Sequence, residues 1–284
     1  MARLSGGVKK LRRSETRWGS YLIAVVLIIY AVAPLVIFAS NALKTRTQIA
    51  QNPIGLPTTW EWSNFATAWN QADMGRGLIN SGIIAVSTAI GVAVIASMAA
   101  YAMTRLNLPA KGGWMVFLLV STSLPIQLFL VPLVSWWSAI GLYDSQFGLI
   151  VIYWALYSPF ATLLVRSFLI GMPKDQEEAA RIDGAGEFAV FARVVAPMIW
   201  PGILTAALVS GLQAYNEFLL AVTFIQDGER LPASLSLYMF QQSFTTDWSM
   251  VSAAGLIMAL PAIVFFILLQ RRFIEGYASG GLAN

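Results

Sequence analysis

Six long apolar segments constrain this chain more strongly than any other feature of its sequence. They cover residues 19–42, 78–104, 114–140, 148–170, 198–224 and 250–269. Each is long enough to cross a bilayer, which takes about 20 mainly apolar residues in a helix. Because lipid offers the backbone no hydrogen-bond partner, each crossing segment must be helical. The sequence therefore predicts an all-α, polytopic membrane protein with about six transmembrane helices, and a charged fraction of only 11% agrees with that class.

The distribution of Lys and Arg predicts which ends of the helices face the cytoplasm. Basic residues concentrate before the first apolar segment, after the second and fourth, and after the sixth. Since positive residues favour the cytoplasmic side, both termini are predicted to be cytoplasmic. This divides the chain into a basic cytoplasmic tail at 1–18, a membrane domain at 19–271 with a cytoplasmic loop at 172–197, and a cytoplasmic tail at 272–284. The first segment exceeds the length of a signal-peptide core, so we interpret it as a retained helix.

Several residue types needed for common chemistry are missing from the sequence. The 284 residues include no Cys and no His, which excludes disulfides, thiolate nucleophiles, His general bases and the usual zinc sites. A phosphate-binding Gly-x-x-x-x-Gly-Lys-Ser/Thr loop is also missing, so we expect no ATP hydrolysis and no cofactor in this chain. The basic residues flank apolar segments, which argues against nucleic-acid binding. A transport role is therefore favoured over a membrane enzyme, and a self-sufficient secondary transporter is one form that it could take.

The loop at 172–197 has the pattern of two short helices. Pro173 followed by Asp175 is a helix-start signal, and Asp175-x-x-Glu178 resembles a capping box. Gly184 can adopt the positive φ that ends a helix, and Pro197 ends the second one. The first helix carries an apolar strip of Ala179, Ala180 and Ile182. Such a strip at the cytoplasmic surface fits either a docking element for a soluble partner or a helix that lies on lipid headgroups.

The same loop resembles the coupling loop of bacterial ABC importer permeases. The signature of that family is Glu-Ala-Ala, three residues, Gly, nine residues and Ile-x-Leu-Pro. It is matched by Glu178-Ala179-Ala180, Gly184 and Pro197, with Val194 and Ala196 in place of Ile and Leu. Further matches are similar to the maltose-type sugar branch and extend over nearly the whole chain, among them Ile182-Asp183-Gly184-Ala185, Pro57-Thr58-Thr59-Trp60 and Asn80-Ser81.

This resemblance implies the type I ABC importer permease fold and a permease subunit of an ATP-driven importer for a di- or oligosaccharide. The residues implied in coupling are Glu178, Ala179, Ala180, Asp183, Gly184 and Pro197. Their implied partner is a dimeric cytoplasmic ATPase, which binds the ATP and magnesium. The other implied partners are a second homologous permease, an extracytoplasmic sugar-binding protein and membrane lipid, in a bacterial cytoplasmic membrane. A related ABC importer for another small solute is the alternative.

Polar residues within the fifth apolar segment are candidates for the wall of a translocation pathway. Gln213, Asn216 and Glu217 are three and four residues apart and so share one helical face. Polar groups inside a membrane are costly, which makes them functional candidates, and these can hydrogen-bond sugar hydroxyls. Tyr215 could stack on a sugar ring. Two alternatives are that Glu217 lies in water at the outer helix end and that Asn216 bonds only a neighbouring helix.

Two further patterns concern the packing of the helices and the outer face. Small residues recur every fourth position in the second segment, at Ala85 and Ala89, and in the fifth, from Gly202. Such stripes let helix backbones approach closely, either within this chain or between subunits. The polar loop at 225–248 is predicted to be extracytoplasmic and to face the binding protein.

Overall fold

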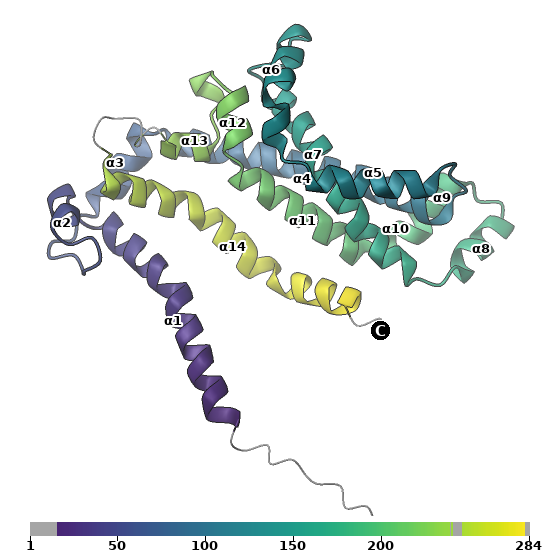
Figure 1. Cartoon of the computed structure of the whole chain (residues 1–284), viewed down its shortest axis with the longest axis horizontal. Coiled ribbons are helices and arrows are strands. Elements are labelled where there is room, and N and C mark those ends of the chain that lie inside the picture. Colours follow the sequence, from purple (N-terminus) through teal and green to yellow (C-terminus); the bar gives the residue numbers. More distant parts are fainter. Residues whose placement is uncertain (1–15, 239, 241–245, 282–284) are drawn as a thin grey trace, which may run out of the picture.

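The computed structural model describes residues 16–238, 240 and 246–281, and every regular element in these ranges is helical (Figure 1). The all-α prediction is therefore confirmed for this part of the chain. The elements are α1 (Thr16–Ala42), α2 (Arg46–Gln51), α3 (Ser63–Gln71), α4 (Met74–Arg105), α5 (Lys111–Ser123), η1 (Ile126–Phe129), α6 (Leu130–Ala139), α7 (Gln146–Ile170), α8 (Asp175–Ile182), α9 (Glu187–Val190), η2 (Phe191–Val195), α10 (Ala196–Met198), α11 (Trp200–Asn216), α12 (Leu219–Phe224), η3 (Gly228–Arg230), α13 (Ala233–Tyr238) and α14 (Trp248–Gly281).

Four of these helices are each long and apolar enough to cross a membrane. They are α1, α4, α7 and α14, and they coincide with the first, second, fourth and sixth predicted segments. Helix α14 continues to Gly281, so the predicted tail at 272–284 begins as an extension of that helix. Residues 1–15 of the predicted basic tail lie outside the described residues, as do Gln241, Gln242 and Ser243 of the predicted outer loop.

The third predicted segment is not one straight helix. Helix α5 ends at Ser123, and the chain turns by 94° before η1 and α6 continue. Pro125 lies at this turn, and Leu124 before it has an extended backbone with ψ 128°. Proline lacks an N–H group and disfavours a helical residue before it, which accounts for the break. The predicted span over 114–140 is therefore a bent pair of helices.

The fifth predicted segment is also divided. Helix α11 ends at Asn216, Glu217 is extended with ψ 131°, and α12 begins at Leu219. Helix α11 qualifies as a span only together with residues 187–198 before it, across a bend of 81°. Counting each bent pair as one span gives the structure up to six spans, which agrees with the predicted number.

Helices α4, α7 and α11 pack side by side and form the centre of the molecule (Figure 1). Gly211 of α11 faces the small residues Ala85 and Ala89 of α4, and Gly202 faces Phe168 of α7. Ala85, Ala89 and Gly202 belong to the predicted small-residue stripes, whereas Gly211 lies beside the predicted stripe of α11; all of these contacts lie within one chain. Helix α1, by contrast, leaves the body, and none of its most apolar stretch is buried against the described chain.

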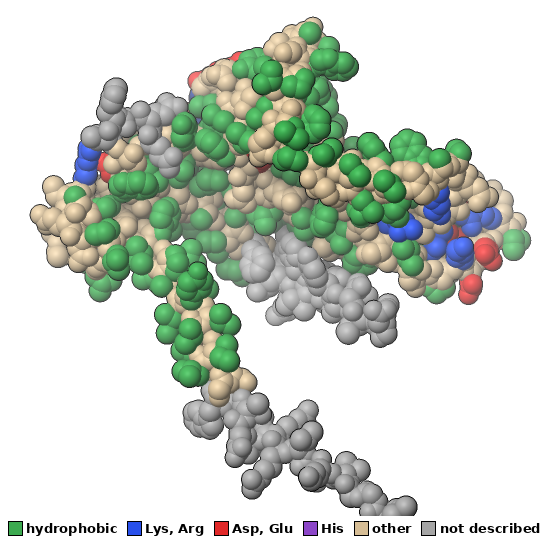
Figure 2. Space-filling model, viewed as in Figure 1, with side chains coloured by type: hydrophobic (Ala, Val, Ile, Leu, Met, Phe, Trp, Pro, Cys, Tyr) green, Lys and Arg blue, Asp and Glu red, His purple; other side chains and the backbone are tan. Residues whose placement is uncertain are grey.

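The two ends of the body differ in polarity. Helices α2 and α3 lie at one end, and α8 and α9 lie at the other (Figure 1). Figure 2 shows the largest group of Lys, Arg, Asp and Glu at the end that carries α8 and α9, with a few charged side chains near the other end, whereas apolar side chains are spread over the rest of this face. The polar end contains the loop at 172–197, which was predicted to be either a docking element or a helix on lipid headgroups.

Candidate functional site

The loop between α7 and α11 exposes most of the residues predicted to couple the chain to a partner. Glu178, Ala179, Asp183, Gly184 and Pro197 are exposed, and Ala180 is half-buried against the core formed by α4, α7 and α11. The exposed side of the loop also presents apolar groups, because Ile182 is 85% exposed and Phe188 is 72% exposed. A mixed apolar and acidic surface of this kind is suited to contact with a soluble protein.

The two ends of helix α8 are stabilised in different ways. The predicted capping box does not form, because Lys174 occupies the N-cap position and makes no side-chain capping bond. Asp175 instead lies in the first turn, where an acidic side chain interacts favourably with the helix dipole. The helix ends as predicted at Gly184, which has φ +86°. Ala185 N–H donates to the Ala180 carbonyl at 3.0 Å, and Gly184 N–H donates to the Arg181 carbonyl at 3.1 Å, as in a Schellman motif.

The inner side of α8 carries a buried carboxylate that sequence analysis missed. Glu177 is fully buried, and its Oε1 accepts a hydrogen bond from Arg105 Nε at 2.7 Å. Arg105 is the last residue of α4, and its Nη2 also donates to the Met172 carbonyl at 3.1 Å. Helical spacing could have indicated that Glu177 faces inward, because it is three residues before Ala180 and four before Arg181 and so shares their face of α8.

A second set of polar contacts joins α8 to α9 and α4. Arg181 Nε donates to Glu187 Oε1 at 2.8 Å, and Tyr101 of α4 donates its hydroxyl to Glu187 Oε2 at 2.6 Å. The bond from Arg181 lowers the pKa of the Glu187 carboxyl, and the same bond raises the pKa of Arg181. Both side chains are therefore charged at neutral pH, and the turn between α8 and α9 is closed by an ion pair.

The predicted pathway residues separate into two groups. Gln213 and Asn216 are exposed at the end of α11, where Asn216 Nδ2 donates to the Leu212 carbonyl at 2.9 Å. Tyr215 instead points into the protein, and its hydroxyl donates to the Met258 carbonyl of α14 at 2.7 Å. The structure thus places Gln213 and Asn216 together and Tyr215 in a packing position, away from an exposed face.

Glu217 lies beyond the end of α11 and caps the next helix. Its carboxylate accepts the backbone N–H of Leu220 at 2.9 Å and that of Ala221 at 3.1 Å. It also accepts the hydroxyl of Tyr153 from α7 at 2.9 Å. The helical spacing that placed Glu217 beside Gln213 assumed a continuous helix, and the helix ends before Glu217. The carboxylate is therefore engaged in fixing α12 to α7.

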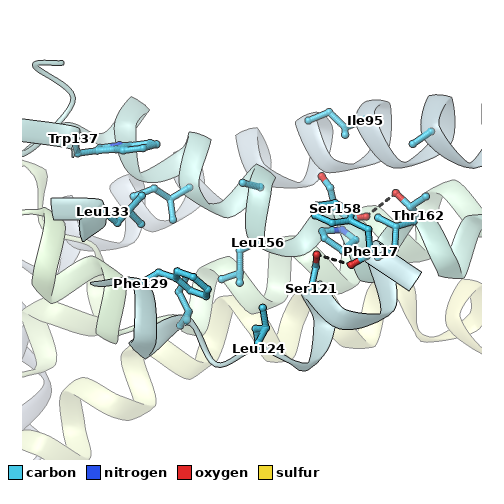
Figure 3. Close-up of a pocket in the computed structure, with 16 residues that line it drawn as sticks. Ile95, Phe117, Ser121, Leu124, Phe129, Leu133, Trp137, Leu156, Ser158 and Thr162 are labelled. Carbon is cyan, nitrogen blue, oxygen red and sulfur yellow. Dashed lines mark hydrogen bonds between the residues drawn. The ribbon is translucent and has the colours of Figure 1, made fainter. Parts of the chain in front are cut away.

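An apolar hollow of about 640 Å³ lies between α4, α7 and the bent α5–α6 pair (Figure 3). Phe117, Phe129, Leu133 and Leu156 contribute to its lining, and none of the predicted pathway residues does. Two hydroxyls drawn in Figure 3 already donate to backbone carbonyls, Ser121 to Phe117 and Thr162 to Ser158. A sugar requires many hydrogen-bond partners, so this hollow does not suit one.

Metal chemistry finds no support in the described ranges. Within residues 16–238, 240 and 246–281, no three or more His, Cys, Asp or Glu side chains are grouped so that they could hold a metal ion.

Comparison with known proteins gives matches to permease components of transport systems. Residues 91–275 match the family model of the binding-protein-dependent transport system inner membrane component. A probable ABC transporter permease of Bacillus subtilis is 34% identical over 97% of this chain and 92% of its own length. A diacetylchitobiose uptake system permease of Streptomyces coelicolor is 31% identical over 92% of this chain and 87% of its own length.

A solved structure shares the fold at low sequence identity. It is a bacterial ABC transporter involved in the import of the acidic polysaccharide alginate. The superposition has a TM-score of 0.77 at 17% identity, and it covers 93% of this chain and 99% of the other. The predicted type I permease fold is thereby confirmed.

Proposed function

Because this chain belongs to the binding-protein-dependent transport system inner membrane components, we propose that it is a permease subunit of an ATP-driven importer for a di- or oligosaccharide. Among the structural observations, the exposed α8–α10 loop carries this proposal, because it holds the predicted coupling residues in an ordered hairpin at the polar end of the molecule. The two interrupted spans are also a feature of secondary transporters, so they do not discriminate between the two classes. Membership in the family distinguishes an ABC importer permease from a secondary transporter.

The partner proposed for the loop is a dimeric ATPase on the cytoplasmic side. Glu178 and Asp183 offer negative charge, and Ile182 and Phe188 offer apolar area that is exposed in the isolated chain. Burying these two side chains in a cleft of the ATPase would remove apolar area from water and fix the register of the hairpin. In this arrangement the ATPase binds the ATP and magnesium, both termini of the permease are cytoplasmic, and the layout of tails and membrane domain is the one predicted above.

The proposed translocation wall is the end of α11. Gln213 and Asn216 present amide groups that can donate to and accept from sugar hydroxyls. A second, homologous permease would supply the opposite wall, and an extracytoplasmic binding protein would deliver the sugar. Glu217 supports this wall by holding the α11–α12 break, through its bonds to α12 and to Tyr153.

The test is copurification followed by reconstitution. The tagged permease, expressed with its genomic neighbours, should bring down an ATPase and a second permease from mild detergent. The complex with its binding protein should take up labelled disaccharide in liposomes in an ATP-dependent manner, and this chain alone should take up none. Concentrative uptake by the chain alone would contradict the proposal, and uptake by the complex of a solute other than sugar would contradict the substrate class.

A further inference from the structure

The buried pair Arg105–Glu177 joins two elements that are far apart in the sequence. The side chains are 4% and 1% exposed, and Arg105 Nε lies 2.7 Å from Glu177 Oε1. The second carboxylate oxygen, Oε2, lies 3.6 Å from Arg181 Nη2. A buried carboxylate without its cation would be strongly unfavourable, so the position of α8 is tied to the position of Arg105.

Arg105 is the last residue of α4, a long helix without a break. Helix α4 runs over 32 residues from Met74 to Arg105, which corresponds to about 48 Å at 1.5 Å per residue. The guanidinium also holds the carbonyl of Met172, just after α7, at 3.1 Å. One side chain therefore fixes the cytoplasmic ends of α4 and α7 to the inner face of α8.

The opposite end of α4 is bonded to the outer segment between α12 and α13. Asn80 Nδ2 donates to the carbonyls of Glu229 and Leu231, both at 3.0 Å. Ser81 Oγ accepts the backbone N–H of Ala233 at 2.9 Å. A shift of α4 along its axis would therefore pull on residues 229–233 at the far side of the molecule.

From these contacts we infer that Glu177 and Arg105 are positioning residues for coupling, which pass a displacement of the α8–α10 loop to α4 and through α4 to the outer segment 229–233. The inference rests on the proposed function, because it assumes that an ATPase moves this loop. The neighbouring Glu178 differs in role, since it is exposed and available to the partner, whereas Glu177 is enclosed by its own chain.

The test compares two carboxylates of the same helix. Glu177→Gln removes the buried charge and keeps the shape of the side chain. Asp175→Asn makes the same chemical change at an exposed position of α8 and serves as the matched control. For each variant, the amount of copurified ATPase, the ATPase rate stimulated by the binding protein and the sugar uptake are measured on the reconstituted complex.

We expect Glu177→Gln to retain the ATPase and to lower the sugar taken up per ATP by roughly 2- to 30-fold, the range of coupling changes caused by residues outside the binding sites. Asp175→Asn should match the wild type. Unchanged uptake per ATP in assembled Glu177→Gln complex would overturn the inference and leave the proposed function intact. If the wild type itself brings down no ATPase, the proposed function fails instead.

A second variant decides the case in which Glu177→Gln does not assemble. Arg105→Lys keeps a positive charge beside Glu177, but a lysine cannot reproduce the planar fork that reaches both Glu177 and the Met172 carbonyl. We expect an assembled complex with uptake per ATP reduced by a smaller factor. If Arg105→Lys shows wild-type sugar uptake per ATP, or if neither variant assembles, the Arg105–Glu177 pair serves folding alone and the inference is overturned.

Discussion

Replacing Gly184 tests whether the end of α8 must have its observed backbone shape. Gly184 has φ +86°, and a Cβ atom added there would meet no other atom within 4 Å. The penalty for a side chain is therefore conformational rather than steric. An L-residue held in the left-handed region costs about 1–2 kcal/mol, with Asn least affected and β-branched residues most affected.

This penalty predicts a graded loss of function in the order Asn, Ala, Val at position 184. A local cost of about 1–2 kcal/mol lowers the population ratio of the native loop conformation to other loop conformations by roughly 5- to 30-fold. The assay is copurification of the ATPase and ATP-dependent sugar uptake, with the membrane level of the permease measured in parallel. Membrane insertion should be unchanged, since Gly184 is exposed and outside the spans.

Gly186 provides a matched control in the same loop. It is also exposed with no atom within 4 Å of an added Cβ, but its φ of −70° suits any residue. Gly186→Val should therefore retain assembly and uptake that Gly184→Val loses. Equal behaviour of the two valine variants, or full activity of Gly184→Val, would refute the argument from backbone conformation.

Three further predictions address other regions. Asn216→Ala should change sugar uptake or preference while the complex still assembles; reduced assembly would instead indicate a packing role. Hydrogen bonds from the backbone amides of Asp227 and Gln226 lower the pKa of Asp144. The ionised carboxylate therefore contributes its full stabilisation at pH values above the ordinary pKa of about 3.9, and this stabilisation is lost as the pH falls through the lowered pKa. Amide exchange in residues 225–231 should accelerate over that lower pH range, and Asp144→Asn should abolish this pH-dependent acceleration. Gly91→Leu should reduce thermal stability in detergent by about 1–3 kcal/mol, because its Cβ would overlap the Trp154 indole; an unchanged melting temperature would contradict this packing.

The sequence was sufficient to predict the apolar spans but not the breaks within them. Apolar length identifies a span because the bilayer sets it. Hydropathy averaged over a window does not register a change of chain direction, so Leu124 and Pro125 were included in one predicted span although the proline was visible. At Glu217 the cause is tertiary, since its carboxylate leaves the α11 face and caps α12 beside Tyr153.

The loop residues show a similar limit. Gly184 could be predicted because a helix end has a local requirement for positive φ. Glu177 could not be assigned a partner, because Arg105 is 72 residues away and only the folded chain brings the two together. Most of the sequence pattern at 178–184 lies on the side of the loop that faces outward, whereas the partners of inward-facing residues are determined by packing against α4 and α7.

The two broken spans also determine which residues can move together. Glu217 bonds α12 to Tyr153 of α7, so α12 is expected to follow α7. Gln213 and Asn216 belong to α11, whose Tyr215 is bonded to Met258 of α14. A relative displacement of α7 and α11 would therefore be taken up between α11 and α12, where Glu217 has an extended backbone and interrupts the helix. The break therefore separates the proposed sugar-facing amides of α11 from the α12 segment.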